Sequence, residues 1–348
     1  MSKSLEVLQA LSDAFGVCGF EDEVRDVVRT MIEPHVDEMR VDTLGNLIAT
    51  RKGSGADLPT LMIDAHLDEI GFMVQYIEDN GFIRFCAIGG WDARIIPSHA
   101  ITIVTDDGRR VKGVVGTTPP HVLPPADREK GHRMEDLFLD IGATSAAEAA
   151  AMGVRVGLPA VIAYPFEQYT EQFVTGKGFD DRGGCAVLVR TLQELAGQEL
   201  DVNLAAVFSV SEEVGLVGAT TATYQVQPDI ALVLEGTICV DTPGTPPARQ
   251  PTRSGKGPAI TVADGGQIVR ARMVRALTSI GDRNGIPWQY KLPPFGGTNG
   301  RAVQLSRDGV LAGCVSLPVR YIHSPHSMLR LDDFEHTVQL VTAFAREA

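Results

Sequence analysis

Apolar residues recur with a helical period in the first part of the chain. One stripe spans residues 5–15 and a second spans residues 24–31, each with spacings of three and four. This spacing predicts two amphipathic helices. The segment EMRVDTLGNLIATRKG (38–53) predicts two strands joined at Gly45-Asn46. The continuous apolar run in LPTLMIDAHLDE (58–69) predicts a buried parallel strand that ends in polar residues.

The pattern changes between residues 70 and 165. Short alternating runs are separated by hairpin signals at Asn80-Gly81 and Asp107-Gly108. One long stretch, GTTPPHVLPPADREKGHRMEDL (116–137), is rich in proline and charge and contains His121. We interpret this region as a β module inserted into a larger domain.

An α/β pattern resumes at about residue 166. An apolar helical stripe spans residues 185–195, and the closing segment 329–347 predicts a last helix capped by Asp332 or Asp333. Three further buried strands are predicted at VNLAAVFSVS (202–211), IALVLEG (230–236) and AGCVSLPVRYIHS (312–324). The predicted fold class is therefore α/β, with one domain formed by residues 1–69 and 166–348 and an insertion at residues 70–165.

Composition limits the classes of partner. The 348-residue chain has a formal net charge of −13 and an ordinary apolar content, which argues against nucleic acids and anionic membranes as partners. No apolar run approaches the roughly 20 residues that span a bilayer. The five cysteines are scattered and form no C-x-x-C pair, so we expect reduced thiols and a cytoplasmic location.

Polar residues follow each predicted buried strand. His66 and Asp68 come after the strand at 58–65, and Glu212 and Glu213 come after the strand at 202–211. Glu235 and His323 stand in the same place after the two later strands. The carboxyl ends of parallel strands share one edge of a sheet, where ligands bind. We therefore expect these side chains to meet near Asp180 and Asp181, which occupy a glycine-rich turn before the 185–195 helix.

Converging carboxylates would repel one another unless cations neutralised them. Histidine nitrogen with carboxylate oxygen and no cysteine suits zinc, cobalt or manganese at a hydrolytic site. Asp180 is the natural bridge between two such ions, and Asp68 is placed to orient His66. Glu212 and Glu213 are adjacent and point apart, so one could ligate while the other acts as general base. Spacing alone leaves open which glutamate does which.

Six segments carry a resemblance to a known family. They are DAHLDEIGFMV (64–74), GKGFDDRGGCAV (176–187), SVSEEVGLVGA (209–219), LEGT (234–237), PFGGTNG (294–300) and RYIHSPHS (320–327). In order and spacing they resemble the tetrahedral aminopeptidases, also called glutamyl or deblocking aminopeptidases. Close relatives of these enzymes are often labelled cellulase M endoglucanases.

The resemblance implies a zinc-peptidase-like mixed sheet with helices on both faces, interrupted by a small β-barrel dimerisation domain. It implies an aminopeptidase with two divalent ions, a bridging water and peptide substrates, and dimers that assemble into a tetrahedral dodecamer. The implied roles are one metal on His66, Asp180 and Glu235, a second on Asp180, Glu213 and His323, Glu212 as general base, and Asp68 orienting His66. It also implies a cis peptide between Asp180 and Asp181, with Asp181 holding the turn instead of a metal.

Two departures from the family pattern concern specificity. Many members have aspartate where this chain has Glu235, and GGTD where this chain has GGTN with Asn299. In the family the latter loop lies near the substrate. His326 is expected to be a surface residue, while His121 fits either a loop position or an approach to the active site.

Two other functions are alternatives to the aminopeptidase. A glycoside hydrolase needs two carboxyl groups flanking a sugar bond and no metal, so the two histidines would be superfluous. A catalytically silent scaffold would not need the complete set of metal-type residues. The sequence therefore favours a metal-dependent aminopeptidase, with glycoside hydrolysis as the alternative.

Overall fold

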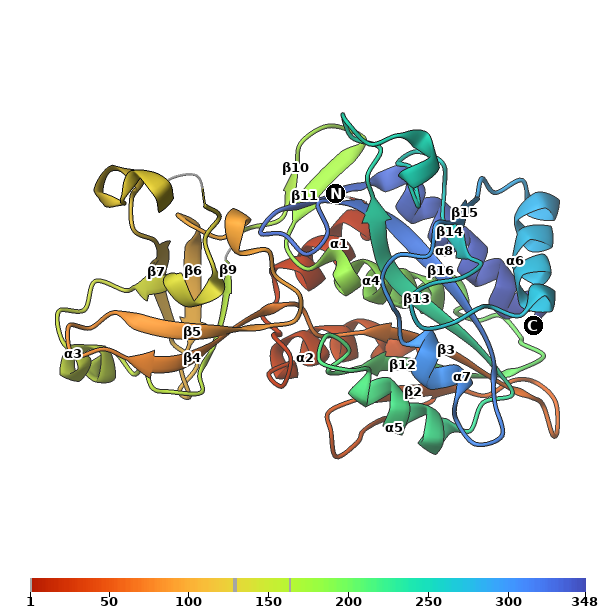
Figure 1. Ribbon diagram of the computed structural model, residues 1–348. Helices are drawn as coiled ribbons and strands as arrows, with labels where there is room; N and C mark the ends of the chain where they lie inside the picture. The colour runs from red at the N-terminus through yellow and green to blue at the C-terminus, as the bar shows by residue number, and fades with distance from the viewer. Residues whose placement is uncertain (1, 128–129, 163) are drawn as a thin grey trace.

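A computed structural model describes residues 2–127, 130–162 and 164–348. The chain forms two bodies, an α/β body and a smaller β-barrel at one side of it (Figure 1). The predicted α/β class with an inserted barrel is confirmed. Part of the proline-rich stretch 116–137 lies outside the described residues.

The α/β body is organised around one mixed sheet of eleven strands, in the order β1-β2-β12-β3-β13-β16-β17-β11-β10, with β14 and β15 attached beside β16. The central strands β12, β3, β13 and β16 run parallel, and the outer pairs are antiparallel. The strands are β1 (Glu38–Val41), β2 (Leu47–Arg51), β3 (Thr60–His66), β10 (Glu167–Gln168), β11 (Phe173–Gly176), β12 (Asn203–Ser209), β13 (Ile230–Cys239), β14 (Ala259–Thr261), β15 (Gln289–Lys291), β16 (Leu311–Arg320) and β17 (Ser327–Arg330).

Helices cover both faces of this sheet (Figure 1). They are α1 (Lys3–Asp13), α2 (Asp22–Ile32), α4 (Phe179–Glu194), α5 (Val217–Val226), α6 (Ala271–Asn284), α7 (Gly300–Gln304) and α8 (Leu331–Glu347). In β3, Leu61 and Ile63 face the core shared with α1, α2, α4, α6 and α8, while Met62 faces the smaller core under α5 and α7. This double burial explains why the central strands are continuous apolar runs without alternation.

The barrel closes in the order β4-β5-β8-β7-β6-β9, and every pairing is antiparallel. Its elements are β4 (Gly71–Ile77), β5 (Ile83–Ile88), β6 (Ala100–Val104), β7 (Arg110–Gly116), β8 (Phe138–Asp140), α3 (Ala146–Ala151) and β9 (Pro159–Ile162). The expected hairpins join β4 to β5 through Gly81 and β6 to β7 through Gly108, and both glycines have positive φ, as tight turns require.

One helix boundary differs from the sequence prediction. Neither Asp332 nor Asp333 caps α8, because the helix follows directly from β17 and Arg330 occupies the N-cap position. The Asp333 carboxylate instead accepts the backbone N–H groups of Gly255 and Gly257, both at 2.7 Å. Asp333 thus makes tertiary hydrogen bonds in place of the helix-capping hydrogen bond that the local sequence predicts. Across the described residues, none of the helices is long and apolar enough to cross a membrane.

Candidate metal centre

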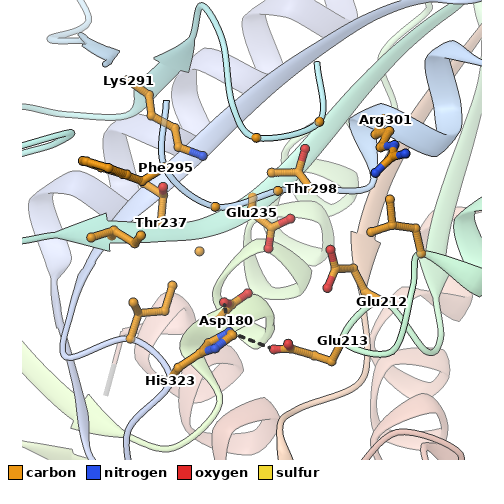
Figure 2. Close-up of a pocket in the computed structure, with 18 residues that line it drawn as sticks. Asp180, Glu212, Glu213, Glu235, Thr237, Lys291, Phe295, Thr298, Arg301 and His323 are labelled. Carbon is orange, nitrogen blue, oxygen red and sulfur yellow. Dashed lines mark hydrogen bonds and ion pairs between the residues drawn. The ribbon is translucent and has the colours of Figure 1, made fainter. Parts of the chain in front are cut away.

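The polar residues predicted at the strand ends meet at one edge of the central sheet. Figure 2 shows Glu212, Glu213, Glu235 and His323 among them. His66 ends β3, Glu212 and Glu213 follow β12, and His323 lies in the turn after β16. Glu235 differs slightly from expectation because it lies within β13, which continues to Cys239. Together with Asp180 at the start of α4, four of these side chains line one end of a cavity of about 680 Å³, namely Glu212, Glu213, Glu235 and His323. His66 does not line the cavity but contacts Asp180 and Glu235.

His66 is held between a backbone carbonyl and three carboxylates. Its Nδ1 lies 3.0 Å from the Asp68 carbonyl oxygen and 3.4 Å from Asp68 Oδ1. Its Nε2 lies 3.2 Å from Asp180 Oδ1 and 3.3 Å from Glu235 Oε1. Because a carbonyl can only accept, Nδ1 carries the proton in the neutral ring and the Nε2 lone pair faces the two carboxylates.

His323 repeats this arrangement on the other side of Asp180. Its Nδ1 lies 3.0 Å from the carbonyl oxygen of Gly90, and its Nε2 lies 3.1 Å from both Asp180 Oδ2 and Glu213 Oε1. Gly90 follows β5, so the inserted barrel segment supplies the acceptor that fixes this ring. This contact could not be predicted from residue types, because any residue can supply a backbone carbonyl.

Lone pairs that face one another in a buried site call for cations between them. Glu213 Oε1 and Glu235 Oε2 have no hydrogen-bond partner among the described residues. The donor atoms of His66, Asp180 and Glu235 form one group that could hold an ion, and those of Asp180, Glu213 and His323 form a second. The chemistry of both groups, imidazole nitrogen with carboxylate oxygen, fits a divalent transition metal.

The electrostatics agree with this interpretation. Burial lowers the pKa of His323, but Asp180 and Glu213 outweigh it and raise that pKa to about 11. Burial raises the pKa of Glu235 well above its usual range, and the neighbouring Asp180 raises it further. Without a cation, these clustered carboxylates favour protonation of the site. A bound metal ion would neutralise their charge instead.

Asp68 contributes more than the orientation of one histidine. It is fully buried, and its two carboxylate oxygens accept the backbone N–H groups of Glu212 at 3.0 Å and Glu213 at 3.1 Å. Although burial raises the pKa of Asp68, His66 and these two donors lower it below its usual range. One carboxylate therefore fixes both the His66 ring and the loop that presents the two glutamates.

The two adjacent aspartates have separate contacts, as the sequence predicted. The peptide bond between Asp180 and Asp181 is cis. Asp181 turns away from the cavity, where its Oδ1 accepts the N–H of Gly184 at 2.9 Å and its Oδ2 accepts the N–H of His66 at 3.2 Å. A Cβ at Gly184 would collide with this carboxylate. Asp181 therefore ties the first turn of α4 to the end of β3.

The loop that carries Asn299 lines the cavity, but the Asn299 side chain itself points elsewhere. Gly296, Gly297 and Thr298 line the cavity, but the buried Asn299 side chain donates to Asp64 Oδ2 at 2.8 Å and to Ser209 Oγ at 3.0 Å. The residue at this position thus acts on Asp64 beneath the sheet edge. The Asn-for-Asp departure is not a direct change in the cavity wall.

The two remaining histidines lie outside the ligand groups. His326 Nε2 lies 2.8 Å from Thr175 Oγ1, and its ring stacks on Tyr164. His121 is exposed in a short turn (Pro120–Val122) and is not among the residues that line the cavity.

Comparison with known proteins gives the family. The model for the M42 glutamyl aminopeptidases matches residues 45–340. The chain belongs to the M42 aminopeptidase family. It is 31% identical to a lysyl aminopeptidase of Pyrococcus furiosus over 98% of this chain and 96% of that protein. It is 30% identical to a glutamyl aminopeptidase of Lactococcus lactis over 94% of this chain and 91% of that protein.

Solved structures of similar proteins share the whole M42 fold. An aminopeptidase from Desulfurococcus kamchatkensis superposes with a TM-score of 0.95 at 38% identity, covering 99% of this chain and 95% of that one. The TET1 peptidase of Pyrococcus horikoshii, which can assemble into a tetrahedron or a large octahedral shell, has a TM-score of 0.90 at 32% identity, covering 99% and 100%. A Thermotoga maritima protein described as an endoglucanase has 0.80 at 34%, covering 98% and 96%. The family that the motifs indicated is confirmed, and the chain is a peptide hydrolase.

Proposed function

We propose that this M42 enzyme removes N-terminal residues from peptides by using two divalent cations, with zinc or cobalt as the expected metals and manganese as a third candidate. His66, Asp180 and Glu235 would hold one ion, and Asp180, Glu213 and His323 would hold the other. The observation that carries the proposal is the position of Asp180, whose two oxygens each face a different histidine at 3.2 and 3.1 Å. Each of those histidines also faces a second carboxylate.

When bound, the cations would polarise the scissile carbonyl and acidify the attacking water. Glu212 would accept a proton from that water and pass it to the leaving amine. The two adjacent glutamates differ in a way that supports this assignment. Glu213 Oε1 lies 3.1 Å from His323, whereas Glu212 lines the same cavity without an ion pair to either histidine in the described chain. Burial and the neighbouring carboxylates raise the pKa of Glu212 to about 8, with His66 opposing them.

We further propose that residues 1–69 and 166–348 form the catalytic domain and that residues 70–165 form a dimerisation domain. The β-barrel exposes apolar side chains, among them Tyr76 at 58% and Val114 at 48%. Its resemblance to the barrel of the TET1 peptidase supports dimers that assemble into a tetrahedral dodecamer. Light scattering at micromolar subunit concentration tests this, and a monomer would overturn it.

Glu212→Gln tests the proposed chemistry. Reconstituted with zinc or cobalt, the variant should keep both ions by elemental analysis and lose about 10²–10⁴-fold in kcat on aminoacyl anilides. The matched variant Glu213→Gln should lose an ion. Metal loss in Glu212→Gln with retention in Glu213→Gln would reverse the two roles.

A glucan substrate provides the second arm of this experiment. The endoglucanase description of the Thermotoga relative suggests glycoside hydrolysis, but that mechanism needs no metal. Metal-independent cleavage of a soluble glucan, with no cleavage of any aminoacyl anilide, would overturn the proposal.

A further inference from the structure

A loop of the inserted barrel reaches the candidate metal centre. It is formed by Gly89, Gly90 and Trp91, directly after β5. The carbonyl oxygen of Gly90 lies 3.0 Å from His323 Nδ1. A Cβ placed on Gly89 would lie 3.3 Å from Glu213 Oε2. The loop therefore lies against both a histidine and a carboxylate of the same proposed metal group.

The two glycines fit closely but cannot hold the loop themselves. A Cβ at Gly90 would lie 3.1 Å from His323 Nδ1, and Gly89 has a φ of +76°, where other residues are strained. Neither glycine has a side chain that could anchor the loop, and glycine leaves the backbone conformationally free. The position of the Gly90 carbonyl therefore depends on the residues that flank the two glycines.

Trp91 provides an anchor on one flank. Its Nε1 donates a hydrogen bond of 3.1 Å to the carbonyl oxygen of Gly71, the first residue of β4. Its ring stacks on that of Phe72, with the ring centroids 4.8 Å apart and the ring planes at 24°. Phe72 is 0% exposed and belongs to the core of the barrel. Trp91 therefore fastens the loop to a part of the barrel that is itself held by packing.

We propose that Trp91 is a positioning residue for the metal group of Asp180, Glu213 and His323. By fixing the loop, it keeps the Gly90 carbonyl on Nδ1 of the histidine. That contact sets the tautomer and the orientation of the ring, so its Nε2 lone pair faces the two carboxylates (Figure 2). This inference rests on the proposed two-ion site and adds a residue that neither lines the cavity nor binds an ion.

The group of His66, Asp180 and Glu235 has its own means of orienting its histidine. His66 Nδ1 lies 3.0 Å from the carbonyl oxygen of Asp68 and 3.4 Å from its carboxylate. Asp68 belongs to the chain that follows β3 and not to the barrel loop. Loss of Trp91 should therefore weaken the binding of one ion and spare the other.

Trp91→Leu tests this without any substrate. Equilibrium dialysis against buffered Co²⁺, followed by elemental analysis, measures the affinity of each ion. We expect one ion to bind about 10- to 100-fold more weakly, the usual effect of losing a group that orients a ligand, and the other to bind as in the parent. The absorption spectrum of the remaining Co²⁺ should match that of the one-ion form of Glu213→Gln.

Two further variants separate positioning from general packing. Trp91→Phe keeps a ring to stack on Phe72 but loses the N–H donor, so its loss of affinity should be smaller than that of Trp91→Leu. The matched control Trp288→Leu removes the other tryptophan of the chain, whose Nε1 donates to Asp282 at 2.9 Å and whose ring contacts Tyr290. It should leave the affinity of both ions unchanged.

The outcomes separate this inference from the proposed function. If the parent binds fewer than two ions after reconstitution, the two-ion proposal fails and the role of Trp91 fails with it. If the parent binds two ions, only the role of Trp91 is overturned by any of three results: unchanged binding in Trp91→Leu, equal weakening of both ions, or the same loss in Trp288→Leu. If Trp91→Leu does not fold, Trp91→Phe decides: several-fold weaker binding of one ion supports the role, and unchanged binding of both overturns it.

Discussion

Glu69 is the single anion of a buried charge network beneath the metal centre. Lys177 Nζ lies 2.7 and 2.9 Å from its two carboxylate oxygens, and Arg182 Nη2 lies 3.3 Å from Oε1. All three residues are at most 7% exposed. Arg182 also donates to the carbonyl oxygens of Leu67 at 2.6 Å and Ala14 at 3.1 Å. The network thus joins α1, the end of β3 and the start of α4, which carry His66 and Asp180.

Glu69→Gln would leave two cations buried together without their counter-charge. Breaking a buried ion pair in this way costs about 3–5 kcal/mol, which corresponds to a fall in melting temperature on the order of 10 °C for a domain of this size. Lys177→Met should cost less, because Glu69 keeps Arg182. The double variant should be more stable than Glu69→Gln alone, since it removes the repulsion between the two buried cations and returns the network to the net charge of the parent.

The direction in which the stability of Glu69→Gln changes with pH provides an independent test. Burial already lowers the pKa of Lys177 although Glu69 opposes this effect, and loss of the carboxylate would lower it further. Between that lowered pKa and the unfolded value near 10.4, the unfolded chain binds more protons than the native state. Stability of the variant relative to the parent should therefore rise from pH 7 to pH 9.

Thermal melting at fixed subunit and metal concentrations measures these effects. The exposed pair of Lys52 and Glu38, with side chains 72% and 70% exposed, provides the matched control, and Glu38→Gln should change stability by less than about 1 kcal/mol. A cost below about 1 kcal/mol for Glu69→Gln, strict additivity in the double variant, or a deficit that widens with pH would refute the reasoning.

Two further predictions concern aspartates near the centre. Asp180→Asn should disrupt both metal groups in elemental analysis, whereas Asp181→Asn should retain the ions and lose stability, because Asp181 contacts only backbone N–H groups. Asn299→Asp should place a second carboxylate against Asp64, whose pKa burial already raises to about 6. Two such groups share a proton, so the native state retains it to higher pH than the unfolded chain does. The deficit in melting temperature should therefore be larger at pH 8 than at pH 5, and equal deficits would contradict this.

The sequence predicted the α/β body well because its central strands are buried on both faces. Such strands leave uninterrupted apolar runs, and β3, β12, β13 and β16 were all identified from them. The barrel was recognisable only as a β insertion through its hairpin glycines. Its closure depends on pairings such as β4 with β9, which join segments far apart in the chain. Those pairings leave no local pattern in the sequence.

The candidate site was predictable for a related reason. Parallel strands bring their carboxyl ends to one edge of the sheet. The polar residues at predicted strand ends therefore indicate which histidines and carboxylates lie together. The same reasoning could not find Gly90, whose contribution is a carbonyl oxygen, or Lys291, which lines the cavity from the end of the short strand β15. In the sequence Lys291 is followed by Leu292 and a Pro-Pro pair, so it resembles an ordinary loop lysine.

The wrong prediction at Asp333 and the unexpected contact of Asn299 have one physical cause. Asp333 suits a helix cap and Asn299 lies in a loop that lines the cavity, but each side chain binds a partner distant in the sequence. Asp333 binds the N–H groups of a glycine turn that precedes β14, and Asn299 binds Asp64 in β3. Short polar side chains can hydrogen-bond to local or to distant groups at similar free energy. Which of the two partners is used therefore depends on which groups are buried together. At Asp180 and Asp181 the local and tertiary demands coincide, because the turn into α4 is also the edge of the candidate metal centre. The cis peptide and the backbone contacts of Asp181 agree with what the family resemblance implies for this turn.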